Sequence, residues 1–272
     1  MNDTETVVET TASDNVLMEI VIGTYERFLL GYNLELESEK FSLKQSFSEH
    51  SHLQSVRCIA SNNKLLASGS IDERIQLYNM KTRKGLGTLI QHNGTVTSLE
   101  FYDSYLISSS EDKTICIWST KNWQCIKTLS GHKYAVNSIS IHPSGKLALS
   151  VSKDKTLRTW NLIKGRSAYI TNIKKVAELV RWSPDGSHFL VAFRNAIDVY
   201  SVESAAVVQT IDFKQKICDL TFIKDEIIAV GGRRKRGYPV KALECVSVNS
   251  ETFLVSTSSD GYIKVWYLDV SE

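Results

Sequence analysis

The stretch GHKYAVNSISIHPSGKLALSVSKDKTLRTW, from Gly131 to Trp160, decides the fold of this chain. Apolar and polar residues alternate from Val136 to Ile141, which is the period-2 pattern of a half-buried strand. The segment Pro143-Ser144-Gly145 then supplies a turn, because proline fixes φ and glycine accepts a positive φ. A second run leads to a turn at Asp154, and a third run ends at Trp160. Three short strands joined by tight turns are therefore predicted within this stretch.

The closing half of this stretch recurs along the chain as an aspartate, two residues, an aliphatic residue, any residue, an aliphatic residue and an aromatic residue. Copies run from Asp72 to Tyr78, Asp112 to Trp118, Asp154 to Trp160 and Asp260 to Trp266, with a degenerate copy from Arg194 to Tyr200. The aromatic ends at 78, 118, 160 and 200 lie 40, 42 and 40 residues apart. His50, His92 and His132 precede their aromatic ends by 28, 26 and 28 residues. A period near 40 predicts a repeat architecture.

This repeat resembles the WD-repeat β-propeller family, in which four-stranded blades surround a central channel. The resemblance implies an all-β fold with nominally seven blades. We assign residues 16–272 to the propeller and residues 1–15, which are acidic and Thr-rich, to a disordered tail. With this assignment the first blade is predicted to lack its inner strand and the last blade its outer strand.

The sixth blade is predicted to be incomplete. Ile217 to Phe222 and Ile227 to Val230 have the pattern of two inner strands, but a new inner strand begins at Val240. Tyr200 and Trp266 are 66 residues apart, where two repeat periods would need about 80. The blade is therefore truncated near residues 232–239, which leaves the edge of its second strand unpaired. The alternative is a genuinely reduced ring in which this loop bridges the neighbouring blades.

Composition excludes several classes of protein. The net charge is +2, with 42% hydrophobic and 23% charged residues, so no strong field favours nucleic acid and any RNA contact is expected to be indirect or weak. The N-terminus has no long apolar run, which predicts neither a secretory signal nor a membrane anchor. Five cysteines form no C-x-x-C pair, which favours reduced thiols in an intracellular protein over disulfides or a metal site.

The histidine, aspartate and tryptophan sets have two interpretations. They resemble acid-base groups of an enzyme, but in WD repeats such residues form a buried hydrogen-bonded set that locks each blade, and the resemblance favours this structural role. The chain has no nucleophile elbow, phosphate-binding glycine loop or metal-ligand spacing, so we predict no enzyme and no cofactor. The residues assigned to these structural sets are Asp72, His92, Asp112, Trp118, His132, Asp154, Trp160, Asp260 and Trp266.

A partner-binding rim is predicted on the face around the central channel. It contains the residue after the first apolar residue of each inner strand and the residue before each turn aspartate. These positions are Arg57, Ile71, Thr97, Glu111, Asn137, Lys153, Glu178, Phe193, Lys241 and Ser259. Ile71 and Phe193 are candidate apolar anchors, and packing of both against neighbouring blades is the open alternative. The run Arg233, Arg234, Lys235 and Arg236 is interpreted as a basic localisation patch or as a solvated loop.

Longer stretches resemble one family closely, the p21-activated-kinase-interacting WD-repeat proteins, whose fungal members are ribosome-assembly factors. The stretches that carry this resemblance are Ile141 to Ile170, Gly23 to Glu26, Ile107 to Lys127, Val180 to Pro184 and Val255 to Trp266. Two departures stand out. The family has a full sixth blade with a histidine before the last inner strand, where Arg236 stands here, and its members tend to continue into a Lys-rich C-terminal tail. We therefore expect a shortened form of the family's chain.

The resemblance implies a non-catalytic scaffold that acts in large (60S) ribosomal subunit biogenesis and pre-rRNA processing. Its location would be the nucleus and nucleolus, and its partners would be pre-ribosomal particle proteins. The alternative is a negative regulator of p21-activated kinase signalling that binds the regulatory region of the kinase. A substrate receptor for a ubiquitin ligase has only the fold in its favour. We expect a monomer without a membrane partner.

Overall fold

Short antiparallel strands form the regular structure of this protein in a computed structural model that describes residues 4–8, 16–37, 40–62, 64–225, 227–233 and 238–269. These residues form seven sheets, labelled A to G here, and each sheet is built from strands that are consecutive in sequence. The sheets are A, β1 (Thr4–Val8), β2 (Val16–Gly23), β3 (Phe28–Glu37) and β4 (Lys40–His50); B, β5 (Val56–Ser61), β6 (Leu65–Ser70), β7 (Arg74–Asn79) and β8 (Lys84–Ile90); C, β9 (Val96–Tyr102), β10 (Tyr105–Ser110), β11 (Thr114–Ser119) and β12 (Cys125–Ser130); D, β13 (Val136–Ile141), β14 (Leu147–Ser152), β15 (Thr156–Asn161) and β16 (Arg166–Asn172); E, β17 (Leu179–Trp182), β18 (His188–Ala192), β19 (Ala196–Ser201) and β20 (Ala206–Asp212); F, β21 (Ile217–Lys224) and β22 (Ile227–Gly232); and G, β23 (Val240–Val248), β24 (Glu251–Ser258) and β25 (Ile263–Leu268). Within this part of the chain, no helix is long and apolar enough to cross a membrane.

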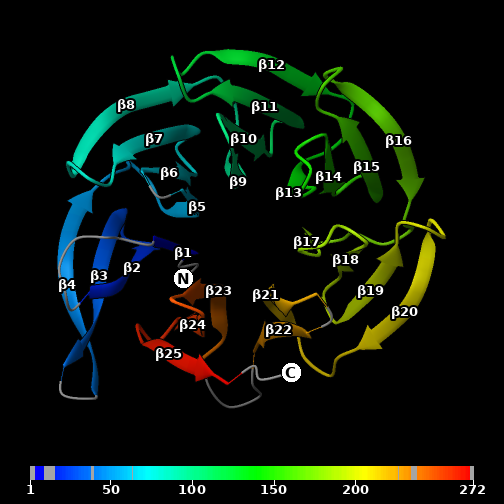
Figure 1. Ribbon diagram of the computed structural model, residues 1–272. Coiled ribbons are helices and arrows are strands. Elements are labelled where there is room, and N and C mark those ends of the chain that lie inside the picture. The colour runs from blue at the N-terminus through cyan, green and yellow to red at the C-terminus, as the bar shows by residue number, and fades with distance from the viewer. Residues whose placement is uncertain are drawn as a thin grey trace.

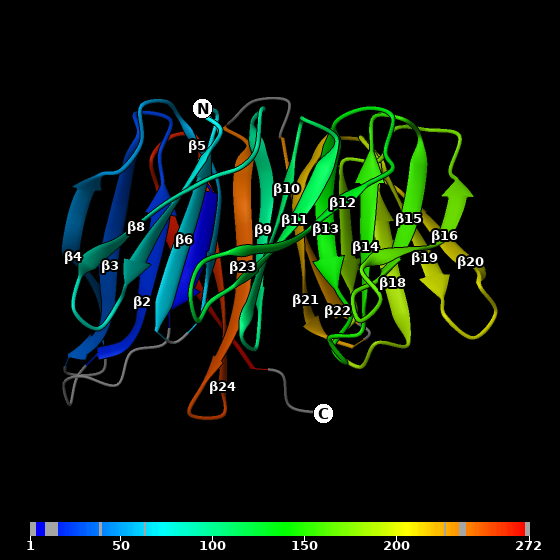
Figure 2. The ribbon, with the colours of Figure 1, turned by 90° about the horizontal axis from the view of Figure 1, so that it is seen from above.

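The sheets are arranged as a ring around a central hollow (Figure 1). The first strand of each sheet lies nearest the hollow, and β4, β8, β12, β16 and β20 form the outer edge of the ring (Figure 1). Seen from the side, the strands run through the thickness of the ring (Figure 2). This arrangement is the all-β propeller that the repeat predicts.

The turn after the second strand of a sheet has the same conformation in successive repeats. Glu73, Lys113 and Lys155 each follow the turn aspartate and have φ values of 68°, 75° and 63°. The carboxylate compensates for this left-handed backbone, because it accepts the N–H of the residue two positions on, as in Thr114 to Asp112 at 2.8 Å. The aspartate therefore shapes the turn that the sequence pattern marks.

Apolar side chains from consecutive sheets pack together and form the core. Buried clusters join A to B, B to C, C to D, D to E and E to F, and another closes the ring between G and A. In the C–D cluster, Ile107 and Ile115 of sheet C pack against Val136, Ile139 and Trp160 of sheet D. Within the described residues, no comparable cluster joins sheets F and G, which touch through their inner strands. The ring is thus continuous inside and weakest at this position.

Two expectations about the first blade were wrong. Residues 1–15 were expected to be a disordered tail, but Thr4–Val8 form β1, which pairs antiparallel with β2. The first blade was expected to lack an inner strand, and β1 supplies it, beside β5 and β23. The alternating TETVV segment carries the strand pattern, and the acidic residues around it obscured this signal. The rest of the expected tail lies outside the described residues.

The predicted blade count is not confirmed. Sheets A to E have four strands each, whereas sheet G has three and sheet F has two among the described residues. β22 ends at Gly232 and β23 begins at Val240, so the predicted truncation falls where these sheets meet. Residues 234–237 of that junction lie outside the described residues.

Candidate functional site at the rim and channel of the ring

A chain of hydrogen bonds joins a loop, two strands and a turn in sheet C. His92 Nδ1 lies 2.8 Å from Asp112 Oδ2, and His92 Nε2 lies 2.8 Å from Ser108 Oγ. Trp118 Nε1 donates to the same serine at 2.9 Å. Sheet D repeats this arrangement with closely similar distances among His132, Ser150, Asp154 and Trp160. The structure thus brings together the residues that the repeat assigned to each set, with a serine between the histidine and the tryptophan.

Sheet B contains the same arrangement with a different histidine from the one that the sequence suggested. His50 was paired with Tyr78 by spacing, but it is exposed at the end of β4. His52 takes the position instead, 3.0 Å from Asp72 and 2.8 Å from Ser68 Oγ. A better signal was the distance to the next inner strand, because His52, His92 and His132 each lie four residues before its first valine, at Val56, Val96 and Val136.

The protonation states in sheet D follow from burial and hydrogen bonding. Burial raises the pKa of Asp154, but hydrogen bonds from Thr156 and from the backbone N–H of Lys133 outweigh it, and the pKa falls to about 2. Burial lowers the pKa of His132 more than the neighbouring carboxylate raises it. The pair is therefore a neutral imidazole beside a carboxylate at neutral pH.

The serines of these sets are not placed for chemistry on a substrate. Ser108 and Ser150 are fully buried, and each Oγ is held between an indole N–H and an imidazole. A nucleophile needs access to a substrate and a free direction of attack, and these hydroxyls have neither. The arrangement instead ties the loop, the middle strands and the turn of one sheet together.

Sheet G carries only part of such a set. Trp266 Nε1 donates to Ser256 Oγ at 3.2 Å, and the N–H of Tyr262 donates to Asp260 at 3.2 Å. Among the described residues, no histidine lies at Asp260. The two residues that the repeat assigned here, Asp260 and Trp266, are therefore not joined into a locked set.

The predicted rim residues divide into exposed groups and groups that brace the ring. Ile71, Glu111 and Lys153 are exposed, and the last two form an ion pair of 3.0 Å between sheets C and D. Thr97 instead donates to the carbonyl of Val136 on the next inner strand, and Asn137 donates to the carbonyl of Ala177 just before the one after that, at 2.8 Å in both cases. Arg57, Glu178, Lys241 and Ser259 are half-buried, with Lys216 located 3.3 Å from Glu178.

Phe193 had two interpretations, an exposed anchor and a residue packed against a neighbouring blade, and the structure supports the second. Its ring is buried among Val180, Val191 and Ala196 in the cluster between sheets D and E. The strand before it ends at Ala192, and Phe193 turns inward because its N–H and the carbonyl of Ala196 close a tight turn. The side chain therefore supports the ring and does not face a partner.

Two exposed apolar side chains on the same loops were missed. Leu53 and Tyr134 have exposed fractions of 63% and 62%. Leu53 follows His52, and its N–H donates to Asp72 at 2.9 Å, so its side chain turns away from the sheet. Tyr134 follows Lys133, whose N–H binds Asp154 in the same way. Their position just after a loop histidine could have indicated this exposure. The N–H that follows the histidine bonds to the turn aspartate, so the backbone there faces the sheet and nearby side chains face solvent.

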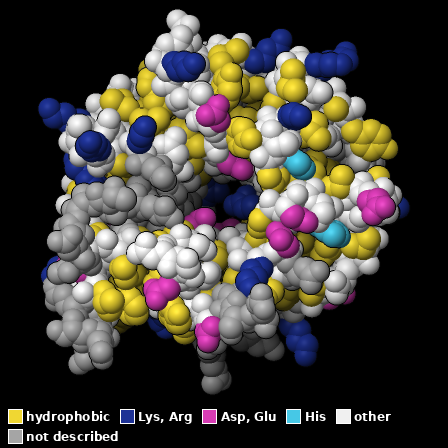
Figure 3. Space-filling model, viewed as in Figure 1, with side chains coloured by type: hydrophobic (Ala, Val, Ile, Leu, Met, Phe, Trp, Pro, Cys, Tyr) yellow, Lys and Arg dark blue, Asp and Glu magenta, His cyan; other side chains and the backbone are white. Residues whose placement is uncertain are grey.

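Charged residues of the inner strands meet in the central channel. Arg181 on β17 lies 3.9 Å from Asp219 on β21, and Glu100 on β9 and Glu244 on β23 also interact with this guanidinium. Burial raises the pKa values of Glu100 and Glu244 to about 7, and it also raises that of Asp219. Figure 3 shows a basic side chain within the central hollow and acidic side chains near it.

The channel carboxylates also brace the ring. Glu100 accepts the N–H of Ile141 at 3.0 Å, which links sheets C and D, and Asp219 accepts the N–H of Leu243 at 2.9 Å, which links F and G. Within the described residues, no group of histidine, cysteine, aspartate and glutamate has a geometry that would hold a metal ion. The channel is thus a charged brace between inner strands.

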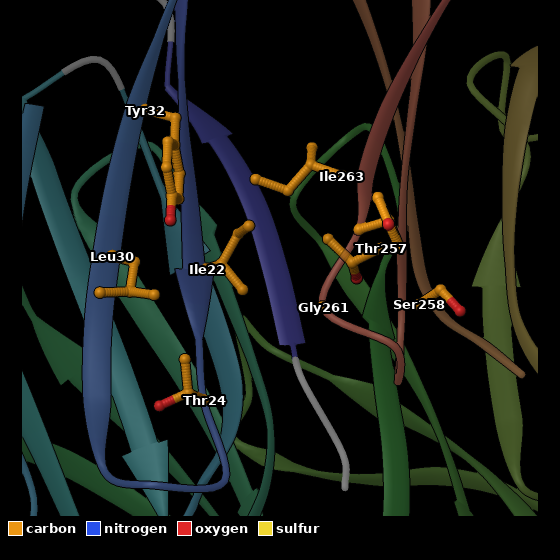
Figure 4. A pocket seen from close by; sticks show the side chains of 9 residues that line it. Ile22, Thr24, Leu30, Tyr32, Thr257, Ser258, Gly261 and Ile263 are labelled. Atoms are coloured by element: carbon orange, nitrogen blue, oxygen red, sulfur yellow. The ribbon is translucent and has the colours of Figure 1, made fainter. Parts of the chain in front are cut away.

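A small pocket lies between sheets A and G, lined by Ile22, Leu30, Tyr32, Thr257 and Ile263 among others (Figure 4). Its volume of about 80 Å³ is well below the roughly 300 Å³ or more of typical small-molecule sites. A second cavity beside His52 holds about 140 Å³. Both are too small for a cofactor, so the exposed rim is the better candidate for function.

Comparison with known proteins places these features in context. The model of the family described as WD domain, G-beta repeat matches residues 41–79, 83–119, 123–161 and 237–267. The chain is 45% identical to a p21-activated protein kinase-interacting protein 1-like from Xenopus laevis, over 94% of this chain and 76% of that protein. It is 42% identical to the human p21-activated protein kinase-interacting protein 1, over 92% and 70%.

A more distant relative is Protein MAK11 of Saccharomyces cerevisiae, which is 29% identical over 95% of this chain and 80% of that protein. The aligned span of 330 residues is longer than the whole chain of 272. The yeast protein therefore has residues within the span that find no counterpart here.

Proposed function

The chain belongs to the WD-repeat family of p21-activated protein kinase-interacting proteins, and from that premise we propose that it is a non-catalytic scaffold in the assembly of the large (60S) ribosomal subunit. The observation that carries the proposal is the likeness along almost the whole chain, including the more distant likeness to Protein MAK11. The stretch from Ile141 to Ile170 contributes most to the resemblance to ribosome-assembly factors. Pre-ribosomal particle proteins are the proposed partners, and the nucleolus is the proposed location.

The geometry supports a scaffold over an enzyme. Ser108 and Ser150, the serines nearest to an acid-base arrangement, are buried within their sheets. The face of the ring that carries the lock histidines and the turn aspartates, here called the loop face, exposes Leu53, Ile71 and Tyr134. These side chains are suited to anchor a protein partner. We therefore place partner binding on this loop face.

Depletion of the protein, followed by sucrose-gradient profiling, tests the ribosomal role. We expect free large subunits to fall, and we expect the wild-type chain, but not a Leu53→Asp, Tyr134→Asp variant, to restore them and to co-purify with pre-ribosomes. Tyr169→Ala is the matched control, because Tyr169 is equally exposed but lies on the outer strand β16. Unchanged subunit ratios together with no co-purification would refute the proposal.

A second candidate function is negative regulation of a p21-activated kinase by binding its regulatory region. The printed names of the Xenopus and human relatives support it. A kinase assay with purified components separates the two candidates. The signalling role requires inhibition that grows with added protein and is lost in the Leu53→Asp, Tyr134→Asp variant, whereas kinase activity that is independent of the protein rules it out.

We further propose that the ring follows a seven-bladed plan in which sheet F is the inner half of a sixth blade. The two-stranded sheet supports this reading. The run from Arg233 to Arg236 is proposed to direct nuclear import. Arg233 is exposed, and the other three residues lie outside the described residues. A fluorescent fusion in which all four are alanine should lose its nuclear signal, and an unchanged distribution would exclude this role.

A further inference from the structure

Sheet F leaves one strand edge open on the outside of the ring. Sheets A to E continue to a third and a fourth strand, but among the described residues no strand pairs with the outer edge of β22. β20 of sheet E and β25 of sheet G lie to either side of it (Figure 1). Unpaired N–H and C=O groups along an edge of this kind are a template for another strand.

The exposure of Trp266 in sheet G also indicates that the outer part of sheet F is open. Trp118 and Trp160 are 3% and 1% exposed, and Trp118 packs against Ala67, Ile75 and Leu77 of the preceding sheet B. Trp266 holds the equivalent place, since it pairs with Leu254 as Trp118 pairs with Leu106. It should therefore face the preceding sheet F, yet it is 50% exposed. Among the described residues, sheet F has no outer strand that would cover it.

The edge itself has the composition of an interior strand. β22 reads IIAVGG and carries no charge, although natural edge strands are usually protected by charges, proline or bulges. Ile228 and Val230 pack towards sheet E in the E–F cluster, while Ile227 is exposed. The apolar packing that joins the other consecutive sheets thus stops at this strand.

We propose that the open edge of sheet F, defined as the outer edge of β22 with the exposed face of Trp266, binds an extended segment of a partner protein by strand addition. The backbone of the segment would pair with β22, and its side chains would cover Trp266. The site continues the sheet-to-sheet packing of the ring, because the E–F cluster ends at β22 and sheet G begins at its far side. This surface is separate from the loop face, and the proposal does not depend on the ribosomal role.

The molecule itself shows which sequence fits such an edge. The third strands β7 and β11 begin two residues after an aspartate and continue with alternate aliphatic residues to an aromatic residue. A third strand runs antiparallel to the second, so its acidic start would lie where β22 ends, beside the exposed Arg233. The partner segment is therefore acidic at its start and aliphatic at alternate positions.

A peptide of residues 111–119 with serine in place of Cys116, labelled with fluorescein, serves as the probe for the full chain. We expect a saturable rise in fluorescence anisotropy, which a scrambled peptide should not give. Trp266→Ala should weaken binding by about fivefold or more, because an aromatic anchor is lost. Ile227→Lys, a change at an exposed residue that leaves the fold intact, should weaken it as well, whereas Tyr169→Ala should leave it unchanged.

Hydrogen exchange provides a second readout, because added peptide should slow the exchange of those amides of residues 227–232 that face away from β21. Three results would overturn the proposal. They are the absence of saturable binding, an equal loss with Tyr169→Ala, and protection, in the chain alone, of those β22 amides that face away from β21. If such a protected chain is a dimer by light scattering, a second copy covers the edge, and if it is a monomer, the chain covers its own edge.

Discussion

Sheets C and D and sheets F and G start from the same repeat and reach different structures. Trp118, Trp160 and Trp266 each donate to a serine ten residues earlier, so the local hydrogen bond forms in all three. The first two are nearly inaccessible to solvent, and the third is half exposed. The repeat motif therefore specifies the strand pair, but burial of its aromatic residue depends on the neighbouring sheet and on a loop histidine.

Removal of the aromatic residue in each region gives the largest difference between them. Trp160→Ala should lower the free energy of unfolding by about 3 to 5 kcal/mol, because it empties a filled position in the core. Trp266→Ala should lower it by less than about 1 kcal/mol, since half of the surface of the Trp266 side chain already contacts water. Denaturant unfolding followed by circular dichroism measures both, with Tyr169→Ala as the surface control. Equal losses would mean that the two regions are equally packed.

Completion of sheet F should make the packing of sheet G more like that of sheets C and D. An insertion of about 14 to 20 residues of strand between Gly232 and Val240, the deficit estimated from the repeat period, should stabilise the ring by about 2 kcal/mol. It should also reduce aggregation, because the edge of β22 becomes paired. Size-exclusion chromatography and thermal melting of both forms side by side test this. Identical melting temperatures and profiles would show that the open edge of β22 does not destabilise the short form.

The turn aspartates of sheets D and G should differ in how their contribution to stability depends on pH. The folded pKa of Asp154 is lowered from 3.8 to about 2, so its contribution is present above pH 3.8 and is lost as the pH falls towards 2. Asp154→Asn should therefore cost about 2 kcal/mol at pH 7 and progressively less in acid. Asp260→Asn in sheet G should have little effect, because the turn there has no histidine partner among the described residues. Unfolding curves between pH 2 and pH 7 provide the measurement, and a constant difference would contradict the assignment.

The channel acids should respond in the opposite direction. The pKa of Glu100 is raised from 4.5 to about 7, so the stability linked to its neutral form is present below pH 4.5 and is lost as the pH rises through 7. Glu100→Gln keeps an acceptor for the N–H of Ile141 and removes the buried charge. We expect it to stabilise the protein by about 1 kcal/mol at pH 8 and not at pH 4. Melting temperatures at the two pH values decide, and destabilisation at pH 8 would show that the charged form is needed.

The repeat period was enough to predict the propeller and the three strands between Gly131 and Trp160. These features depend on local alternation and on turn residues, which a single sequence carries. β1 was missed because its strand pattern covers only five residues and acidic residues around them obscured it. Its place beside β5 and β23 depends on the closed ring and not on the segment itself.

The candidate site was predicted less well because it depends on side-chain direction. His50 and His52 are two residues apart, and only the register of the loop selects the one that faces Asp72. Phe193 turns inward at a tight turn that the pattern does not encode. Arg181 and its three carboxylates come from four different strands, so their meeting requires the assembled ring.

The ring is closed by side-chain packing between sheets A and G, and each sheet consists of consecutive strands. Under mechanical tension applied at residues 16 and 268, the contact between sheets A and G, here called the seam, would carry the load. Among the described residues, no strand of one of these sheets pairs with a strand of the other, so only side-chain packing resists the pull. We expect the seam to part first and the sheets to detach one after another. Each repeat of about 40 residues would release roughly 140 Å of extended chain. In an optical trap the protein would lengthen as a staircase, so that the repeat of the sequence could be read as a step in extension.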